Sequence, residues 1–415
     1  MVQDNVDQRR RRKSGLAGNI ALVLVSVIVA LLFMEAILRL MPSLISVPLL
    51  AYFPAPLRHE IADRLSLPSI NDYVVIESAD RADHGPPLYH PAPNSIFITA
   101  RDPADTALGA VESERRDARG FCNPLENGSR THVDIVAAGD SFTTCTGIKA
   151  EDTSSNQLEH MGSYTAYNIG VGNLGLYEYV ELLRHYGLAL KPRLVIMNIY
   201  EGNDLRDAVR YQTFLENGRD RQADGNALEG RLSMSYAISF LYAVKGWQLA
   251  QWRGIEGMRS NYHYAAKSQG VMVPMNVTNA DLGEVRDAKR LKDGEIRLDL
   301  WAPPLQAFKD LAQANGFIPI VSYTPSMHEA YADTVVFEDE ETGRTMKYAS
   351  AAQREWLAKK TAELGLTYID LTPAFQEAVK SGPLTHFPAN VHLTPYGQQV
   401  TATAWKPLID KLLAK

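Results

Sequence analysis

Short apolar segments alternate with amphipathic segments over most of the chain after residue 130. Five apolar runs of four to eight residues are bounded by Gly, Pro, Asn or Asp, which is typical of strands buried on both faces of a parallel sheet. They are Val133–Ala138, Ala166–Ile169, Leu194–Tyr200, Phe317–Tyr323 and Leu366–Leu371. Helical patterns lie near residues 152–161, 175–190, 303–315, 348–364 and 396–414. This alternation predicts an α/β domain, a three-layer α/β/α sandwich around about five parallel strands.

The N-terminus has a different pattern. Leu16–Met34 contains 19 residues without a charge, mostly Leu, Val, Ile and Ala. Since a helix rises about 1.5 Å per residue, this run matches the ~30 Å hydrocarbon core of a bilayer. The basic cluster Arg9–Lys13 precedes it, which predicts a cytoplasmic N-terminus and an extracytoplasmic main domain. A cleaved signal peptide would have a shorter apolar core and a small-residue cleavage site, which Leu40–Ser43 does not supply, so we predict a signal-anchor helix.

These patterns divide the chain into four parts. Residues 1–15 form a basic cytoplasmic tip, and residues 16–40 form the transmembrane helix. Residues 41–130 are rich in Pro and Asp and are interpreted as a linker and an N-terminal extension. Residues 131–415 form the main domain, in which 205–300 interrupt the alternation and are interpreted as an inserted lid or side wall.

Composition narrows the class of protein. With 46% hydrophobic and 22% charged residues, the chain is typical of a folded protein. Lys and Arg number 42 and Asp and Glu number 48, and this mild acidity gives no reason to expect a nucleic-acid partner. The chain has two Cys, too few for a disulfide scaffold or for a zinc site built on Cys alone. No metal or organic cofactor is implied.

Polar signatures follow four of the predicted strands. They are Gly139-Asp140-Ser141-Phe142-Thr143, the Asn168–Gly175 loop, Gly202-Asn203-Asp204 and His392-Leu393-Thr394-Pro395-Tyr396-Gly397. Each alone has an ordinary interpretation as a turn or a helix cap. The Gly-rich loop could also suggest phosphate binding, but it lacks the Walker lysine and the G-x-G-x-x-G spacing. Because ligands bind beyond the carboxyl ends of parallel strands, we expect the four signatures to converge at one edge of the sheet.

Together, these blocks resemble the SGNH (GDSL-type) hydrolases, over roughly residues 130–204 and 366–400. The resemblance implies a flavodoxin-like fold, with Ser141 as nucleophile and His392 as general base. It implies that the side chain of Asn203 donates a hydrogen bond to the oxyanion. The second block supplies a backbone donor, which we assign to Asn173, with Gly172 as the alternative. The N-terminal helix ahead of such a domain is similar to membrane-anchored bacterial envelope members of the family.

The chemistry of these residues fits the roles. A serine hydroxyl is a poor nucleophile until a base takes its proton, and His is the base best matched to neutral pH. The tetrahedral intermediate needs preplaced donors, each of which contributes about 10²–10³ in rate. The N–H groups of Ser141 and of the second block, with Asn203 Nδ2, would supply three.

One departure concerns the residue that orients the histidine. The family places an Asp two or three residues before the His, where this chain has Asn390 and Ala389. In a serine-protease triad, Asp→Asn costs about 10⁴ in rate because the wrong tautomer is held. Three interpretations stay open: Asn390 Oδ1 accepts from His392 Nδ1, another carbonyl or carboxylate orients the ring, or the site binds without turnover.

Other residues at this edge are weaker candidates. His386 could compete with His392 for the role of base. Glu201 and His328 follow the third and fourth strands and could contact a substrate. Cys122 and Cys145 flank the first strand, and we predict a disulfide between them because an extracytoplasmic domain can be oxidised. The alternative is two separate thiols.

We expect, from the resemblance and the location, hydrolysis of a small acyl ester, an O-acetyl group, on an envelope or exported polysaccharide. That domain would be periplasmic in a Gram-negative cell. An O-acyltransferase would use the same acyl-Ser141 intermediate, and only exclusion of water separates the two reactions. A non-catalytic polysaccharide-binding or assembly module is the alternative from another class.

Overall fold

The computed structural model describes residues 2–98, 103–217, 235–246, 248, 264–268, 271–275 and 279–414. The chain forms two compact units. The first comprises residues 1–70 and 225–248, and the second comprises residues 71–224 and 249–415. The region 205–300 is therefore divided between the two units, and part of it lies outside the described residues. Its interpretation as a lid stays a prediction.

The first unit is helical. Helix α1 (Val2–Leu40) contains a stretch, Asn19–Leu40, that is long and apolar enough to cross a membrane. It is followed by α2 (Val47–Leu50) and α3 (Ala55–Arg64). Residues 236–246 form a further helix of this unit. It is tied to α1 at its start, because Glu35 Oε2 accepts from Ser235 Oγ at 2.7 Å and from the N–H of Ala237 at 2.8 Å.

The second unit contains, within the described residues, a parallel five-stranded sheet in the order β12-β10-β7-β5-β6. Its strands are β5 (Ile135–Gly139), β6 (Ala166–Asn168), β7 (Leu194–Tyr200), β10 (Ile318–Thr324) and β12 (Thr367–Asp370). All five strands expected from the apolar runs are present. Every residue of β5 and β7 is buried, which explains why these strands appear in the sequence as continuous apolar runs.

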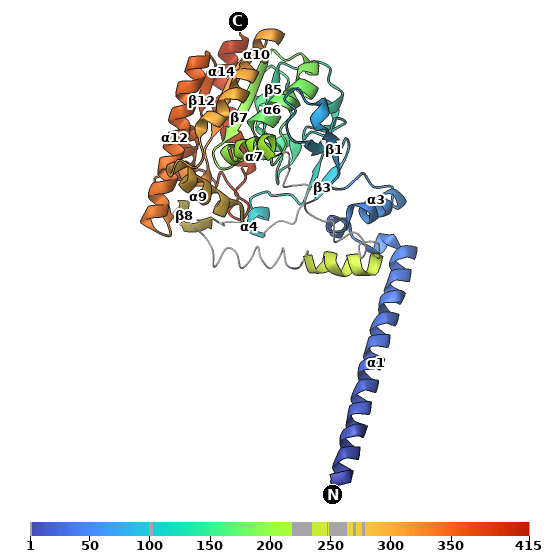
Figure 1. Cartoon of the computed structure of the whole chain (residues 1–415). Coiled ribbons are helices and arrows are strands. Elements are labelled where there is room, and N and C mark those ends of the chain that lie inside the picture. The colour runs from blue at the N-terminus through green and yellow to red at the C-terminus, as the bar shows by residue number, and fades with distance from the viewer. Residues whose placement is uncertain are drawn as a thin grey trace. The chain divides into compact units, whose positions relative to one another are not determined.

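Helices cover both faces of this sheet (Figure 1). Successive residues of β7 belong to different cores, since Val195 and Met197 pack in one and Leu194 and Ile196 in the other. The first core includes residues of α6 (Leu176–Leu182), α7 (Asp204–Asn217), α9 (Asn279–Lys292), α10 (Ala302–Asn315) and α12 (Glu340–Leu364). The second includes α5 (Ser154–Met161), α11 (Met327–Ala330), α13 (Thr372–Ser381) and α14 (Pro395–Leu413). The predicted three-layer α/β/α sandwich is confirmed.

Small antiparallel sheets flank this domain. Strand β1 (Tyr73–Ile76) pairs with β2 (Leu88–Pro91), and β3 (Ile96–Ile98) pairs with β4 (Ser113–Arg115). The short helix α4 (Pro103–Thr106) lies between β3 and β4 in the chain. Strands β8 (Tyr264–Ser268), β9 (Val271–Met275) and β11 (Val335–Phe337) form a third sheet. The sequence did not indicate these short strands, because three to five residues are too few to establish a period.

Candidate active site

The turn after β5 presents Ser141 at the carboxyl end of the strand. Asp140 Oδ1 accepts from the N–H of Phe142 at 2.8 Å, and the carbonyl of Asp140 accepts from Thr143 and Thr144. Gly139 is required at the strand end, because a Cβ there would lie 2.0 Å from Thr143 Oγ1. The residues around Ser141 are buried, whereas Ser141 itself is partly exposed. The turn therefore offers one hydroxyl to a ligand and holds it on a rigid base.

The carboxylate of Asp140 joins Ser141 to Asn203. Ser141 Oγ donates to Asp140 Oδ2 at 3.5 Å, and Asn203 also forms a hydrogen bond with this carboxylate. Asn203 Nδ2 donates to Asp207 Oδ2 at 2.7 Å. The structure thus brings together two of the predicted site residues, which come from the loops after β5 and β7.

Asp140 belongs to a group of buried acids that also includes Asp204 and Asp207. Burial raises the pKa of Asp140 to about 7, and the charge of Asp207 adds to the rise, while hydrogen bonds from Phe142 and Asn203 oppose it. Burial and the charge of Asp140 raise the pKa of Asp204 well above its ordinary value. Asp140 and Asp204 therefore retain protons close to neutral pH.

The second block lies against Ser141. A Cβ placed on Gly172 would lie 3.5 Å from Ser141 Cβ, which is ordinary van der Waals contact. Asn173 adopts a left-handed conformation with φ of 63°, which Asn tolerates, and its carbonyl accepts from Arg210 at 3.0 Å. Gly172 is therefore next to the nucleophile in the fold, and Asn173 directly follows it in the chain. The choice between Gly172 and Asn173 stays open.

His392 is held in a loop that packs against the residue after Ser141. The carbonyl of His392 accepts from the N–H of Phe387 at 2.8 Å, and its ring centroid lies 5.0 Å from that of Phe142. The preceding residue, Val391, has φ of 60°, which is a strained conformation for a β-branched side chain. Backbone strain of this kind is stored where the surrounding structure over-determines a position. The loop between α13 and α14 therefore reaches the Ser141 region, and the role of His392 as base stays a prediction.

Asn390 makes a bond that the sequence did not indicate. Its Oδ1 accepts from the backbone N–H of His392 at 3.0 Å. The oxygen that we expected to orient the imidazole thus binds the peptide group of the same residue. Whether it also orients the ring stays a prediction.

His386 is a poor candidate for the base. It is fully buried, and its Nδ1 lies 3.0 Å from Thr385 Oγ1. Burial, together with the charge of nearby His392, lowers the pKa of His386 to about 3. A substrate has no access to this ring, which favours His392 for the role.

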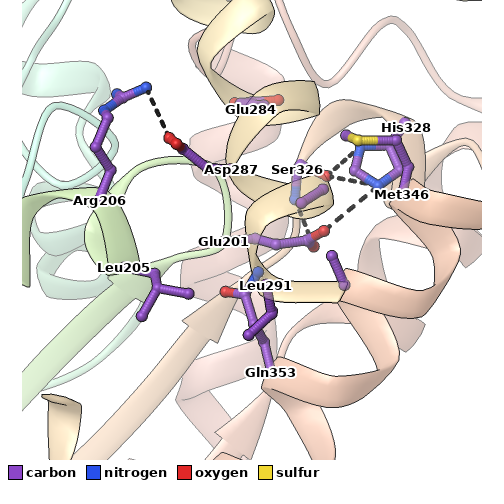
Figure 2. A pocket seen from close by; sticks show the side chains of 13 residues that line it. Glu201, Leu205, Arg206, Glu284, Asp287, Leu291, Ser326, His328, Met346 and Gln353 are labelled. Carbon is purple, nitrogen blue, oxygen red and sulfur yellow. Dashed lines mark hydrogen bonds and ion pairs between the residues drawn. The ribbon is translucent and has the colours of Figure 1, made fainter. Parts of the chain in front are cut away.

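A second Ser–His–acid arrangement lies between the ends of β7 and β10 (Figure 2). Ser326 Oγ lies 2.6 Å from His328 Nδ1, and the N–H of Ser326 donates to Glu201 Oε2 at 3.0 Å. Ser350 of α12 lies between His328 Nε2 and Glu201. The cavity beside these residues measures about 20 Å³, roughly the space that one water needs. An ester cannot enter it, so this cluster joins β7, β10 and α12 rather than binding a substrate.

Polar residues to which the sequence analysis gave no role of their own hold the Ser141 turn. Asn168 Nδ2 donates to the carbonyl of Thr143 at 2.6 Å, and Asn198 Nδ2 donates to Thr143 Oγ1 at 3.1 Å. Gln398 of α14 donates to the carbonyl of Phe142 at 3.1 Å. Asn198 is the polar residue inside the otherwise apolar strand β7, and a buried polar group needs a partner. The presence of Asn198 within an apolar run was the signal that could have identified it as a residue with a specific partner.

The predicted disulfide joins Cys122 to Cys145, with Cα atoms 5.8 Å apart. Cys145 lies four residues after Ser141, and both half-cystines are buried with Phe387, which is part of the His392 loop. Among the residues that the structure describes, no group of three or more His, Cys, Asp or Glu side chains is arranged to hold a metal ion.

Among known proteins, the chain is similar to several solved structures. No protein-family model and no curated protein matches the chain. A structure described as a lipolytic protein of the G-D-S-L family from Desulfitobacterium hafniense DCB-2 is 15% identical, covers 66% of this chain and 98% of its own, and has a TM-score of 0.35. An acylhydrolase from Bacteroides fragilis NCTC 9343 is 14% identical over 70% of this chain and 91% of its own, with a TM-score of 0.33. A variant of an acetyl xylan esterase from Geobacillus stearothermophilus is 13% identical over 68% and 95%, with a TM-score of 0.35.

Proposed function

We propose that the chain is a membrane-anchored serine esterase of the SGNH (GDSL) type that removes a small acyl group, an O-acetyl group, from an envelope or exported polysaccharide. The single observation that carries the proposal is the meeting of Ser141 and Asn203 at the Asp140 carboxylate, with Gly172 against Ser141. The packing of His392 on Phe142 supports the assignment of His392 as the base.

The proposed reaction gives each of these residues a step. His392 takes the proton of Ser141 Oγ as this oxygen attacks the ester carbonyl carbon. The carbonyl oxygen becomes an oxyanion that accepts from Asn203 Nδ2 and from the backbone N–H of Asn173 or Gly172. The bond to the sugar oxygen then breaks, and the protonated His392 returns the proton to that oxygen. A water molecule repeats the sequence on the acyl-serine and releases the carboxylic acid.

Location supports an envelope substrate. Residues 19–40 are long and apolar enough to cross a membrane, and the basic cluster Arg9–Lys13 precedes them. By the positive-inside rule, the second unit then lies outside the cytoplasm. The disulfide between Cys122 and Cys145 is consistent with an oxidising compartment.

Access of water favours hydrolysis over transfer to a second alcohol. Ser141, Asn203 and His392 are each partly exposed, and the cleft beside Gly172 is open to solvent. A transferase must keep water from the acyl-serine, and such exclusion needs a closed site.

The test is labelling of the purified full-length protein in detergent with a fluorophosphonate, followed by mass spectrometry of the labelled peptide. We expect the label on Ser141, with hydrolysis of p-nitrophenyl acetate that Ser141→Ala and His392→Ala each reduce at least 10³-fold. The other Ser–His pair supplies an internal control, because Ser326 is buried and should not react. An unlabelled Ser141 in folded protein, with Ser141→Ala as active as the parent, contradicts the proposal.

A further inference from the structure

An open cleft of about 340 Å³ lies between the second block and the N-terminal extension. Its lining includes Gly172 and Asn173, so it begins next to the proposed nucleophile. The opposite wall comes from the N-terminal extension and includes Tyr73 and Tyr89 of the β1–β2 hairpin. The volume falls at the lower end of the range for small-molecule sites, about 300–1,000 Å³.

The hairpin turns an apolar face toward solvent. Tyr73, Val75 and Tyr89 are 51%, 40% and 39% exposed, and Val75 pairs directly with Tyr89 across the two strands. The alternate residues, among them Ile76 and Leu88, are buried against the domain. Both faces of this small sheet are therefore apolar, although only one contributes to the core. Exposed apolar groups gathered beside a cleft are typical of a binding surface.

Contacts hold the ring of Tyr73 and the segment that connects β1 and β2. The ring of Tyr73 meets Phe97 edge-on, with centroids 5.1 Å apart. In the segment that connects β1 to β2, Arg81 donates to the carbonyl of Pro86 at 2.5 Å. The N–H of Ala82 in the same segment donates to Glu181 of α6 at 3.0 Å. A ligand that packs on Tyr73 thus finds this ring already ordered, and pre-organisation lowers the entropic cost of binding.

The polar wall carries little net charge. Arg210 donates to the carbonyl of Asn173 and lies 3.1 Å from Asp207 and 3.5 Å from Glu178. Its positive charge is therefore offset by two acids, so the cleft has no excess charge to attract a phosphate or a polyanion. Hydroxyl groups, which both donate and accept, suit the guanidinium and carboxylate edges.

We propose that this cleft is a saccharide subsite, in which the apolar C–H face of a neutral sugar ring stacks on Tyr73 and Tyr89. The hydroxyls of the ring bond to Arg210 and Glu178, and the acyl group of the glycan extends past Gly172 to Ser141. This inference rests on the proposed esterase function and assigns the N-terminal extension to substrate selection. The face of an aromatic ring is negative and attracts the C–H groups of a ligand. A sugar ring presents several such groups on one flat face, so it suits these tyrosines.

The test compares two esters and measures binding directly. The ratio of kcat/KM for partially O-acetylated cello-oligosaccharides to that for p-nitrophenyl acetate should fall about tenfold in Tyr73→Ala and in Tyr89→Ala. Phe at either position should retain most of the ratio, because the ring remains. Tyr348→Ala on α12, which removes a similarly exposed ring, should leave the ratio unchanged.

Calorimetric binding of the deacetylated oligosaccharide to full-length Ser141→Ala separates the subsite from the catalysis. Its Kd should rise about tenfold when Tyr73→Ala is added. This result supports the subsite even if Ser141 fails to hydrolyse esters. No binding to Ser141→Ala, or equal Kd values with and without Tyr73, overturns the subsite and leaves the esterase proposal standing.

Discussion

The imidazole of His392 packs on the ring of Phe142, with ring centroids 5.0 Å apart and planes tilted by 34°. Phe142 directly follows Ser141, whereas His392 belongs to the loop before α14, so a single ring contact joins the two ends of the proposed site. Phe142 also stacks on Tyr200 at the end of β7. The three loops that carry the proposed nucleophile, oxyanion donor and base are therefore fixed through one buried side chain.

The orientation of the His392 ring can be tested at Asn390. A carboxylate in place of the amide can accept from His392 Nδ1–H and stabilise the imidazolium, while its other oxygen keeps the bond to the backbone N–H. We expect Asn390→Asp to raise kcat for p-nitrophenyl acetate at least tenfold at pH 8. Asn390→Ala, which removes the backbone bond as well, should lower it. Flat or reduced activity in Asn390→Asp would mean that no orienting group is missing, and attention would move to other partners of the ring.

The disulfide should stabilise the domain that carries Ser141. Cys122 and Cys145 are 23 residues apart, and a loop of this size restricts the unfolded chain by about 3 kcal/mol. Reduction by dithiothreitol should lower the free energy of unfolding, measured by urea denaturation, by this amount. The Cys122→Ser, Cys145→Ser double variant should match the reduced parent and should not respond to the reductant. Equal stability of the oxidised and reduced parent would contradict this prediction. It would show that residues 122–145 stay ordered in the unfolded chain even without the bridge.

The sequence predicted the sheet well for a physical reason. Parallel strands buried on both faces must be apolar throughout, so Leu194–Tyr200 could be identified without any knowledge of its neighbours. The rule that ligands bind at the carboxyl ends of such strands then led to the prediction that Ser141, Asn203 and His392 share one edge. The disulfide followed from the predicted compartment. These inferences use local composition and topology alone.

What the sequence could not give depends on tertiary contacts. Nothing in the local sequence indicates that Asn390 Oδ1 accepts from a peptide N–H rather than from an imidazole N–H, because the same amide oxygen can accept from either donor. Likewise, the period of the helix at 236–246 reveals an apolar side but not that its N-terminus lies at Glu35. The exposed face of Tyr73 and Tyr89 was missed because four residues are too few to establish a period, so neither strand of this hairpin was predicted.

Asp140 should make stability depend on pH. Its pKa is about 7 in the folded protein, whereas an unfolded Asp titrates near 3.9. Between these values the folded state holds the extra proton, so the stability that this group contributes is complete below about pH 4 and is lost as the pH rises through 7. Asp140→Asn keeps an oxygen for the N–H of Phe142 and removes the titration.

The measurement is the free energy of unfolding between pH 4.5 and 7.5 for the parent and Asp140→Asn. We expect the parent to lose stability relative to the variant as the pH rises, by at most about 1.4 kcal/mol per pH unit, the limit for one proton. Asp293→Asn, at an exposed acid after α9, serves as control and should follow the parent. Parallel curves for the parent and Asp140→Asn would show that Asp140 is ionised in the folded protein.

Glu35 should hold the helix at 236–246 on α1. Its Oε2 accepts from Ser235 Oγ and from the N–H of Ala237, so it satisfies donors at the start of that helix, as an N-cap does. Loss of such a cap costs about 1 kcal/mol, which corresponds to roughly fivefold faster opening. In nanodiscs, hydrogen exchange of amides 238–246 should accelerate by that factor in Glu35→Ala and less in Glu35→Gln, which keeps a neutral acceptor. Amides of α14 in the same samples should exchange as in the parent. Unchanged exchange at 238–246 in Glu35→Ala would show that packing against the rest of the first unit, and not this cap, holds the helix.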